Sequence, residues 1–126
     1  MQNSIKALSI VVIFCFIACN APQTTPVTTI GIGSCANQDI PQPLLGLAAT
    51  YKPDYFIFLG DNIYGDTDNM DTLRAKYQRW GGQSSFQQLK KVTQFFATWD
   101  DHDFGRNDAG RHYPFKKESK EIFLSF

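Results

Sequence analysis

Acidic side chains gather at two points of the sequence, each directly after an apolar run. Asp61 and Tyr64 follow the run 55–59, and the cluster Asp100-Asp101-His102-Asp103 follows the run 92–99. Carboxylate and imidazole groups ligate metals, and packed carboxylates repel one another unless solvent or a cation separates their charges. The two clusters therefore favour a metal site. Polar turns are the other interpretation, because Asp and Asn are common turn residues.

The apolar runs predict the elements that must position these groups. Residues 55–59 are aromatic and β-branched, which is typical of a strand buried on both faces, in a parallel sheet with helices on each side. Further strands are predicted over 28–33 and 92–99, and helices over 43–51, 72–80, 86–91 and 115–126, with Asp71 capping the second helix. This order predicts an α/β fold with a right-handed crossover. Polar groups that follow the strands then meet at one edge of the sheet.

Cys35 follows the first predicted strand and would lie at the same edge. A lone cysteine there can be a small buried hydrophobe. It can also supply a thiolate ligand for a metal. A third interpretation is a nucleophile with His102 as its base, as in cysteine hydrolases. Spacing alone leaves all three open.

The N-terminus has the pattern of an export signal. Lys6 precedes an apolar stretch, 7–18, which is too short to cross a bilayer and matches the hydrophobic region of a secretory signal. Cys19 follows at once, and the segment resembles a bacterial lipobox. We therefore expect a lipoprotein signal peptide over 1–18, lipidation of Cys19 and an extended tether over 19–29. An ordinary signal peptide with a chance cysteine is the alternative.

These features predict an exported lipoprotein anchored to the cell envelope, at the outer membrane or the periplasmic face. We expect the protein to contact the membrane through the lipid anchor on Cys19. The formal net charge is zero, so bulk electrostatics indicate no nucleic-acid-binding patch.

Three motifs together resemble a known family. Gly60-Asp61-Asn62-Ile63-Tyr64, Trp99-Asp100-Asp101-His102-Asp103 and Ser34-Cys35 are similar to motifs of the alkaline phosphatase D (PhoD-like) family of calcineurin-like metallophosphoesterases. The resemblance covers residues 30–126. It implies an αββα sandwich, present here only in part, and hydrolysis of phosphate esters at a binuclear metal site. The metals implied are Fe³⁺ plus Ca²⁺ or another divalent cation.

The resemblance also implies a role for each matched residue. Asp61 would bridge the two metals, and Cys35 and Tyr64 would ligate the ferric ion. Asp101 would bind the second metal. His102 would act as the general acid or as a donor to the transition state.

The family's further ligands, mainly histidines, come from a later segment. This sequence contains only two histidines, His102 and His112. We therefore expect the N-terminal half of such an enzyme, with an incomplete site. The alternative is a catalytically inactive, membrane-anchored lipoprotein fragment that binds a metal or a partner.

Overall fold

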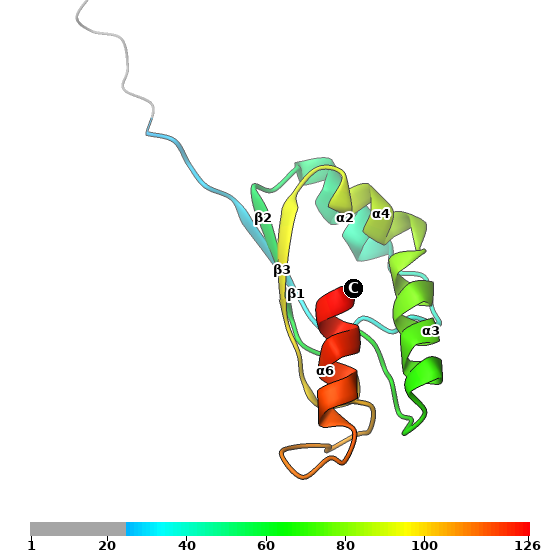
Figure 1. Cartoon of the computed structure of the whole chain (residues 1–126). Coiled ribbons are helices and arrows are strands. Elements are labelled where there is room, and N and C mark those ends of the chain that lie inside the picture. Colours follow the sequence, from blue (N-terminus) through cyan, green and yellow to red (C-terminus); the bar gives the residue numbers. More distant parts are fainter. Residues whose placement is uncertain (1–24) are drawn as a thin grey trace, which may run out of the picture.

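Three parallel strands form the sheet in the computed structural model, which describes residues 25–126 (Figure 1). They are β1 (Ile30–Gly33), β2 (Tyr55–Leu59) and β3 (Gln94–Thr98), in the order β1-β2-β3. Ile30 pairs with Tyr55, and Tyr55 pairs with Gln94. A helical connection joins each strand to the next, so the predicted α/β class is confirmed. A complete αββα sandwich is not seen in this part of the chain.

The helices largely follow the predicted ranges. They are α2 (Pro43–Tyr51), α3 (Met70–Gly81), α4 (Ser84–Lys90), α5 (Asp101–Phe104) and α6 (Lys116–Ser125). The prediction that Asp71 caps α3 is wrong, because the Oδ1 atom of Asn69 accepts the hydrogen bond from the Thr72 amide at 2.9 Å. Helix α3 therefore starts two residues before its predicted first residue. Helix α5 was not predicted.

The helices of the described chain lie on one face of the sheet (Figure 1). Phe56 and Phe58 of β2 point to that face and are buried. The Phe58 ring meets the Trp80 ring edge-on, with centroids 5.1 Å apart, and Trp80 lies 4.2 Å from Phe86. Burying each such aromatic side chain contributes about 2–3 kcal/mol, so this cluster holds α3 and α4 against the sheet.

Two glycines in β1 make room for the core. A Cβ atom built on Gly31 would lie 2.5 Å from the Phe56 ring, and one on Gly33 would lie 3.1 Å from it. The aromatic ring therefore lies across the bare backbone of the neighbouring strand. Glycine weakens a strand in general, and here its presence is explained by this close approach.

The opposite face of the sheet is uncovered in the part of the chain that the structure describes. Tyr55 is 37% exposed and Leu59 is 50% exposed. The prediction that β2 is buried on both faces is therefore wrong for residues 25–126. An apolar run shows that both faces of a strand avoid water, but the layer that covers each face depends on tertiary structure.

The predicted signal peptide, Cys19 and most of the tether lie outside the described residues. At the end of the tether, Thr29 is joined to the domain, because its amide donates a 2.8 Å hydrogen bond to Asp54. Between residues 25 and 126 there is no helix with the length and apolarity needed to cross a membrane.

Candidate metal centre

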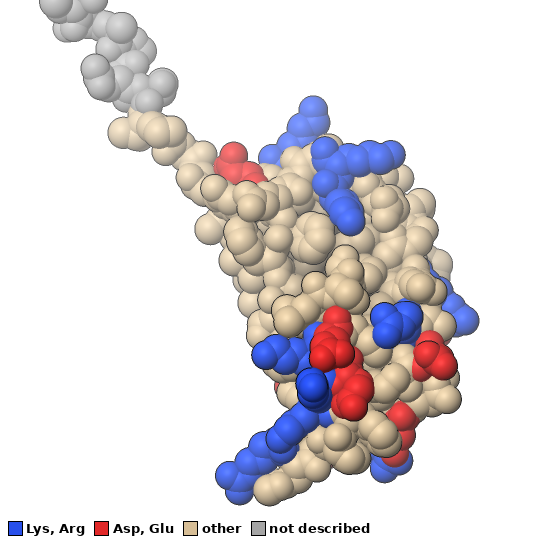
Figure 2. Space-filling view, in the orientation of Figure 1, with Lys and Arg blue, Asp and Glu red and all other residues tan. Residues whose placement is uncertain are grey.

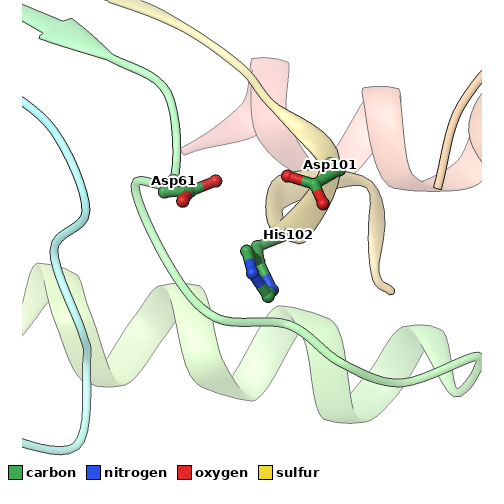
Figure 3. A group of neighbouring side chains, drawn as sticks. All are labelled: Asp61, Asp101 and His102. Carbon is green, nitrogen blue, oxygen red and sulfur yellow. The ribbon is translucent and has the colours of Figure 1, made fainter. Parts of the chain in front are cut away.

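Two predicted metal ligands and the predicted catalytic histidine converge at the carboxyl ends of β2 and β3. One oxygen each of Asp61 and Asp101 and one ring nitrogen of His102 lie within 4.8 Å of one another. Asp61 comes from the loop after β2, and the other two residues come from α5 after β3 (Figure 3). The two carboxylates can share one cation, and the imidazole can add a ligand nitrogen when it is neutral or donate to a bound anion when it is protonated.

One carboxylate oxygen of this group is unpaired. The Oδ1 atom of Asp61 is buried and accepts no hydrogen bond from the described residues. A buried acceptor without a partner costs free energy, and such groups call for an explanation such as a bound ion. The donor set and this unpaired oxygen therefore fit a metal ion.

Cys35 lies beside Asp61 rather than within the group of three. Its Sγ atom is 3.6 Å from the Oδ2 atom of Asp61, and the residue is exposed. The buried-hydrophobe interpretation is thus wrong. No hydrogen bond joins Cys35 to His102 in the described chain, which gives no support to a cysteine nucleophile with His102 as its base. The position leaves the thiol free to act as a ligand.

Tyr64 lies against His102, with ring centroids 4.4 Å apart. Burial raises the pKa of the Tyr64 phenol, and the neighbouring Cys35 side chain and the Asp61 and Asp66 carboxylates raise it further. The phenol is therefore protonated at neutral pH. It would ligate a cation only where the positive charge offsets these effects.

Asp66 is a site residue that the sequence interpretation missed. Its Oδ1 atom lies 2.9 Å from the Nδ1 atom of His102. Burial lowers the pKa of His102, but the hydrogen bond and charge of Asp66 and the charges of Asp101 and Asp61 outweigh burial and raise it. The signal in the sequence was the acidic loop 65–71 directly after Tyr64, which only weakly resembles a calcium loop and did not single out Asp66.

Backbone strain is concentrated at this edge of the sheet. Cys35, Asp61 and Asp66 have positive φ angles of 57°, 50° and 46°. Residues other than glycine rarely adopt this left-handed conformation, and such strain commonly marks functional sites. Gly60, at φ 100°, is required by a close approach, since a Cβ there would lie 2.8 Å from the Cβ of Asp100.

A buried carboxylate holds the two ligand-bearing loops together. The Asp103 side chain is fully buried and accepts hydrogen bonds from the backbone of Asn62, Ile63 and Asp100, from the Asn62 amide and from the Tyr77 hydroxyl. Burial raises the pKa of Asp103, although these donors partly offset it. We call Asp103 and these donors the clamp. It fixes Asp61 relative to Asp101 and His102.

The loop after α5 donates backbone hydrogen bonds to two acidic side chains of the centre, Asp101 and Asp66. The Asp108 amide donates to Asp101, and this hydrogen bond is the main cause of the lowered pKa of Asp101. Arg106 forms an ion pair with Asp68. In Figure 2, acidic and basic side chains lie next to one another over the lower part of the visible face.

The comparisons with known proteins support the fold. No model of a known protein family matches the chain, and no curated protein matches it by sequence. A solved structure does match, described as "Structure of PhoD", with a TM-score of 0.66 and 16% sequence identity. The described chain is similar in fold to PhoD. The match covers 82% of this chain and 26% of the PhoD chain, so the chain spans about a quarter of that protein.

The resemblance inferred from the three motifs is thus confirmed as a similarity of fold to part of PhoD. The structure brings Asp61, Asp101 and His102 together, places Cys35 beside Asp61, and places Tyr64 beside His102. The roles assigned to these residues stay predictions.

Proposed function

We propose that this chain carries part of a metal-dependent phosphoesterase site of the PhoD type. The observation that supports this most directly is the group formed by Asp61, Asp101 and His102, with one buried Asp61 oxygen unpaired. It lies at the carboxyl edge of a parallel sheet, where ligands bind in open α/β folds. The substrate class is phosphate esters.

The residues at the edge divide into two sets of ligands. Asp61 lies centrally and would contact both cations. Cys35 and Tyr64 would hold Fe³⁺ after the cation displaces the thiol and phenol protons, and Asp101 would hold Ca²⁺ or another divalent cation. Bound cations at such a site polarise phosphoryl oxygens and lower the pKa of a water molecule.

His102 would act on the substrate through its second ring nitrogen. Asp66 accepts from Nδ1, which fixes the ring and leaves Nε2 to face a substrate oxygen. The raised pKa keeps the imidazolium form populated nearer to neutral pH. A positioned cationic donor stabilises negative charge that develops on phosphate or on the leaving oxygen.

A second candidate is a metal-binding fragment without catalytic activity. The observation that favours it is the small share of the PhoD chain, 26%, that this chain spans. The ligand set of the described residues has only one histidine, His102, close to the acidic group. Such a chain would bind a cation at the same edge and hydrolyse nothing.

Hydrolysis of an aryl phosphate separates the two candidates. The full-length chain is loaded with Fe³⁺ and Ca²⁺ and assayed with and without a chelator, beside the variants Asp101→Asn and Asp71→Asn. Asp71 is exposed on the first turn of α3, so its variant controls for loss of charge. Turnover that a chelator and Asp101→Asn abolish supports the enzyme. Metal binding without turnover supports the fragment. A chain that neither binds the metals nor hydrolyses the ester contradicts both candidates.

We also propose that the chain is exported and anchored to the cell envelope through Cys19. The support is the apolar stretch 7–18 followed by the lipobox-like cysteine. Cells fed a labelled fatty acid should incorporate it into the wild-type chain and not into Cys19→Ser. Equal labelling of both would contradict the proposal.

A further inference from the structure

The side chains of Gln38 and Lys76 hold the backbone of Tyr64. Tyr64 lies in the segment between β2 and α3, so neither a helix nor a strand pairs its amide and carbonyl groups. Gln38 takes that place: its Oε1 atom accepts from the Tyr64 amide at 2.8 Å, and its Nε2 atom donates to the Tyr64 carbonyl at 3.3 Å. Lys76 of α3 donates to the same carbonyl at 3.0 Å and to the Gly65 carbonyl at 2.7 Å. Every polar group of the Tyr64 backbone is therefore paired by a side chain.

The contact between Gln38 and Tyr64 is built into the interior of the fold. Gln38 is only 3% exposed. Its Nε2 atom also donates to the Oδ2 atom of Asp39 at 2.7 Å, and Asp39 forms an ion pair with Arg79 of α3. These partners fix the orientation of the Gln38 amide, so that its oxygen meets the Tyr64 amide and its nitrogen meets the Tyr64 carbonyl. A buried amide with both polar atoms paired restricts its partner more than one exposed hydrogen bond would.

Gln38 also connects the two residues that would hold the ferric ion. Cys35 and Gln38 both belong to the loop after β1, and the Cys35 amide donates to the Gly60 carbonyl at 3.3 Å. Gln38 adds Tyr64 to this connection between the two loops. The side chains of Cys35 and Asp61 both raise the pKa of the Tyr64 phenol, which places the three groups close together. The position of the phenol relative to the thiol therefore depends on Gln38.

We propose that Gln38 and Lys76 are positioning residues, which hold the Tyr64 phenol beside Cys35 so that both can ligate a ferric ion. The proposal rests on the proposed function, which assigns this pair of ligands to Fe³⁺. Neither positioning residue contacts the ion or the substrate, because each acts through the backbone of Tyr64. Groups that orient metal ligands commonly change metal affinity about 10–100-fold when they are substituted. A purely structural Gln38 would instead change the stability of the fold and leave the iron site as it is.

Visible absorption of the full-length chain, loaded with Fe³⁺ from its citrate complex, tests this proposal. A phenolate bound to Fe³⁺ gives a charge-transfer band, and the part of the spectrum that Tyr64→Phe lacks is assigned to that phenolate. The variants Gln38→Met and Lys76→Met remove the hydrogen bonds to Tyr64 and keep side chains of similar length. Gln42→Met is the matched control, because Gln42 lies in the same loop and its side chain donates to Asn37 and Ile40 instead.

At equal iron content, Gln38→Met should lose at least half of the phenolate band, and competition with citrate should show Fe³⁺ affinity about tenfold lower. Lys76→Met should show a smaller loss, and it alone decides the outcome if circular dichroism shows that Gln38→Met is unfolded. Gln42→Met should match the wild type.

Two results would overturn the positioning role and leave the proposed function standing. One is an unchanged phenolate band in every folded variant of Gln38 and Lys76, and the other is an equal loss in Gln42→Met. A wild-type chain that takes up no Fe³⁺, or takes it up without a phenolate band, would overturn the positioning role together with the assignment of Tyr64 as a ligand.

Discussion

Asp101 and Asp103 are two residues apart in sequence and have opposite surroundings. Asp103 is fully buried, and its two oxygens accept hydrogen bonds from five donors. Asp101 is half-buried and belongs, with Asp61 and His102, to the group in which the buried Oδ1 atom of Asp61 accepts no hydrogen bond. The Asp103 carboxylate thus finds all its partners within the protein, whereas one oxygen of Asp61 does not. The difference separates a structural carboxylate, Asp103, from the candidate metal ligands Asp61 and Asp101.

The largest effect is expected from the clamp. Asp103→Ala removes the carboxylate that accepts from five donor groups, most of them buried, which should lower the free energy of unfolding by about 3–5 kcal/mol. Urea denaturation measures it. Tyr77→Phe removes only one of the donors and should cost about 1 kcal/mol. Equal losses for the two variants would show that the clamp is not centred on Asp103.

A smaller effect is expected where the two loops touch. Gly60→Ala places a methyl group 2.8 Å from the Cβ of Asp100, at a φ of 100°. The strain and the displacement should cost about 2–3 kcal/mol. Gly110→Ala is the control, because a Cβ there meets nothing within 4 Å. If thermal unfolding shows the same midpoint for both variants, the close approach of the loops is not required.

A pH effect should distinguish the metal centre from the clamp. The pKa of His102 is raised because the hydrogen bond and charge of Asp66 outweigh the effect of burial. Protonation of His102 therefore gives its full stabilisation of the fold at pH values below the unfolded-state pKa of about 6.5. That contribution is lost as the pH rises through the folded-state pKa. NMR titration of the His102 ring should show a midpoint above that of an unfolded histidine, and Asp66→Asn should lower it. An unchanged midpoint in Asp66→Asn would rule out the pairing.

Local features of the fold were predictable from the sequence. The ranges of α2 and β2 were predicted as they are found, because Pro43 starts the helix, Lys52-Pro53 ends it, and 55–59 is continuously apolar. Helix α5 was not predictable from periodicity, since its four residues are held by a capping box between Asp100 and Asp103. The exposure of one face of β2 in the described residues was equally unpredictable, because an apolar pattern does not say which layer covers each face.

The candidate site was predictable in part. Strand ends brought Asp61, Asp101 and His102 to one edge, as the α/β order implies. The pairing of His102 with Asp66 depends on how the loop after Tyr64 folds back, which no short-range pattern encodes. The role of Asp103 was hidden for a similar reason, because its partners lie about 40 residues away along the chain.

The metal centre is tested most directly by a Mn²⁺ titration, followed by electron paramagnetic resonance, of the wild-type chain, Asp61→Asn and Asp71→Asn. Asn tolerates the left-handed backbone of residue 61, so Asp61→Asn should change the free energy of unfolding by no more than about 0.5 kcal/mol. We predict saturable binding to the wild type and to Asp71→Asn, and its loss in Asp61→Asn. Equal binding by all three proteins would contradict the assignment of the site.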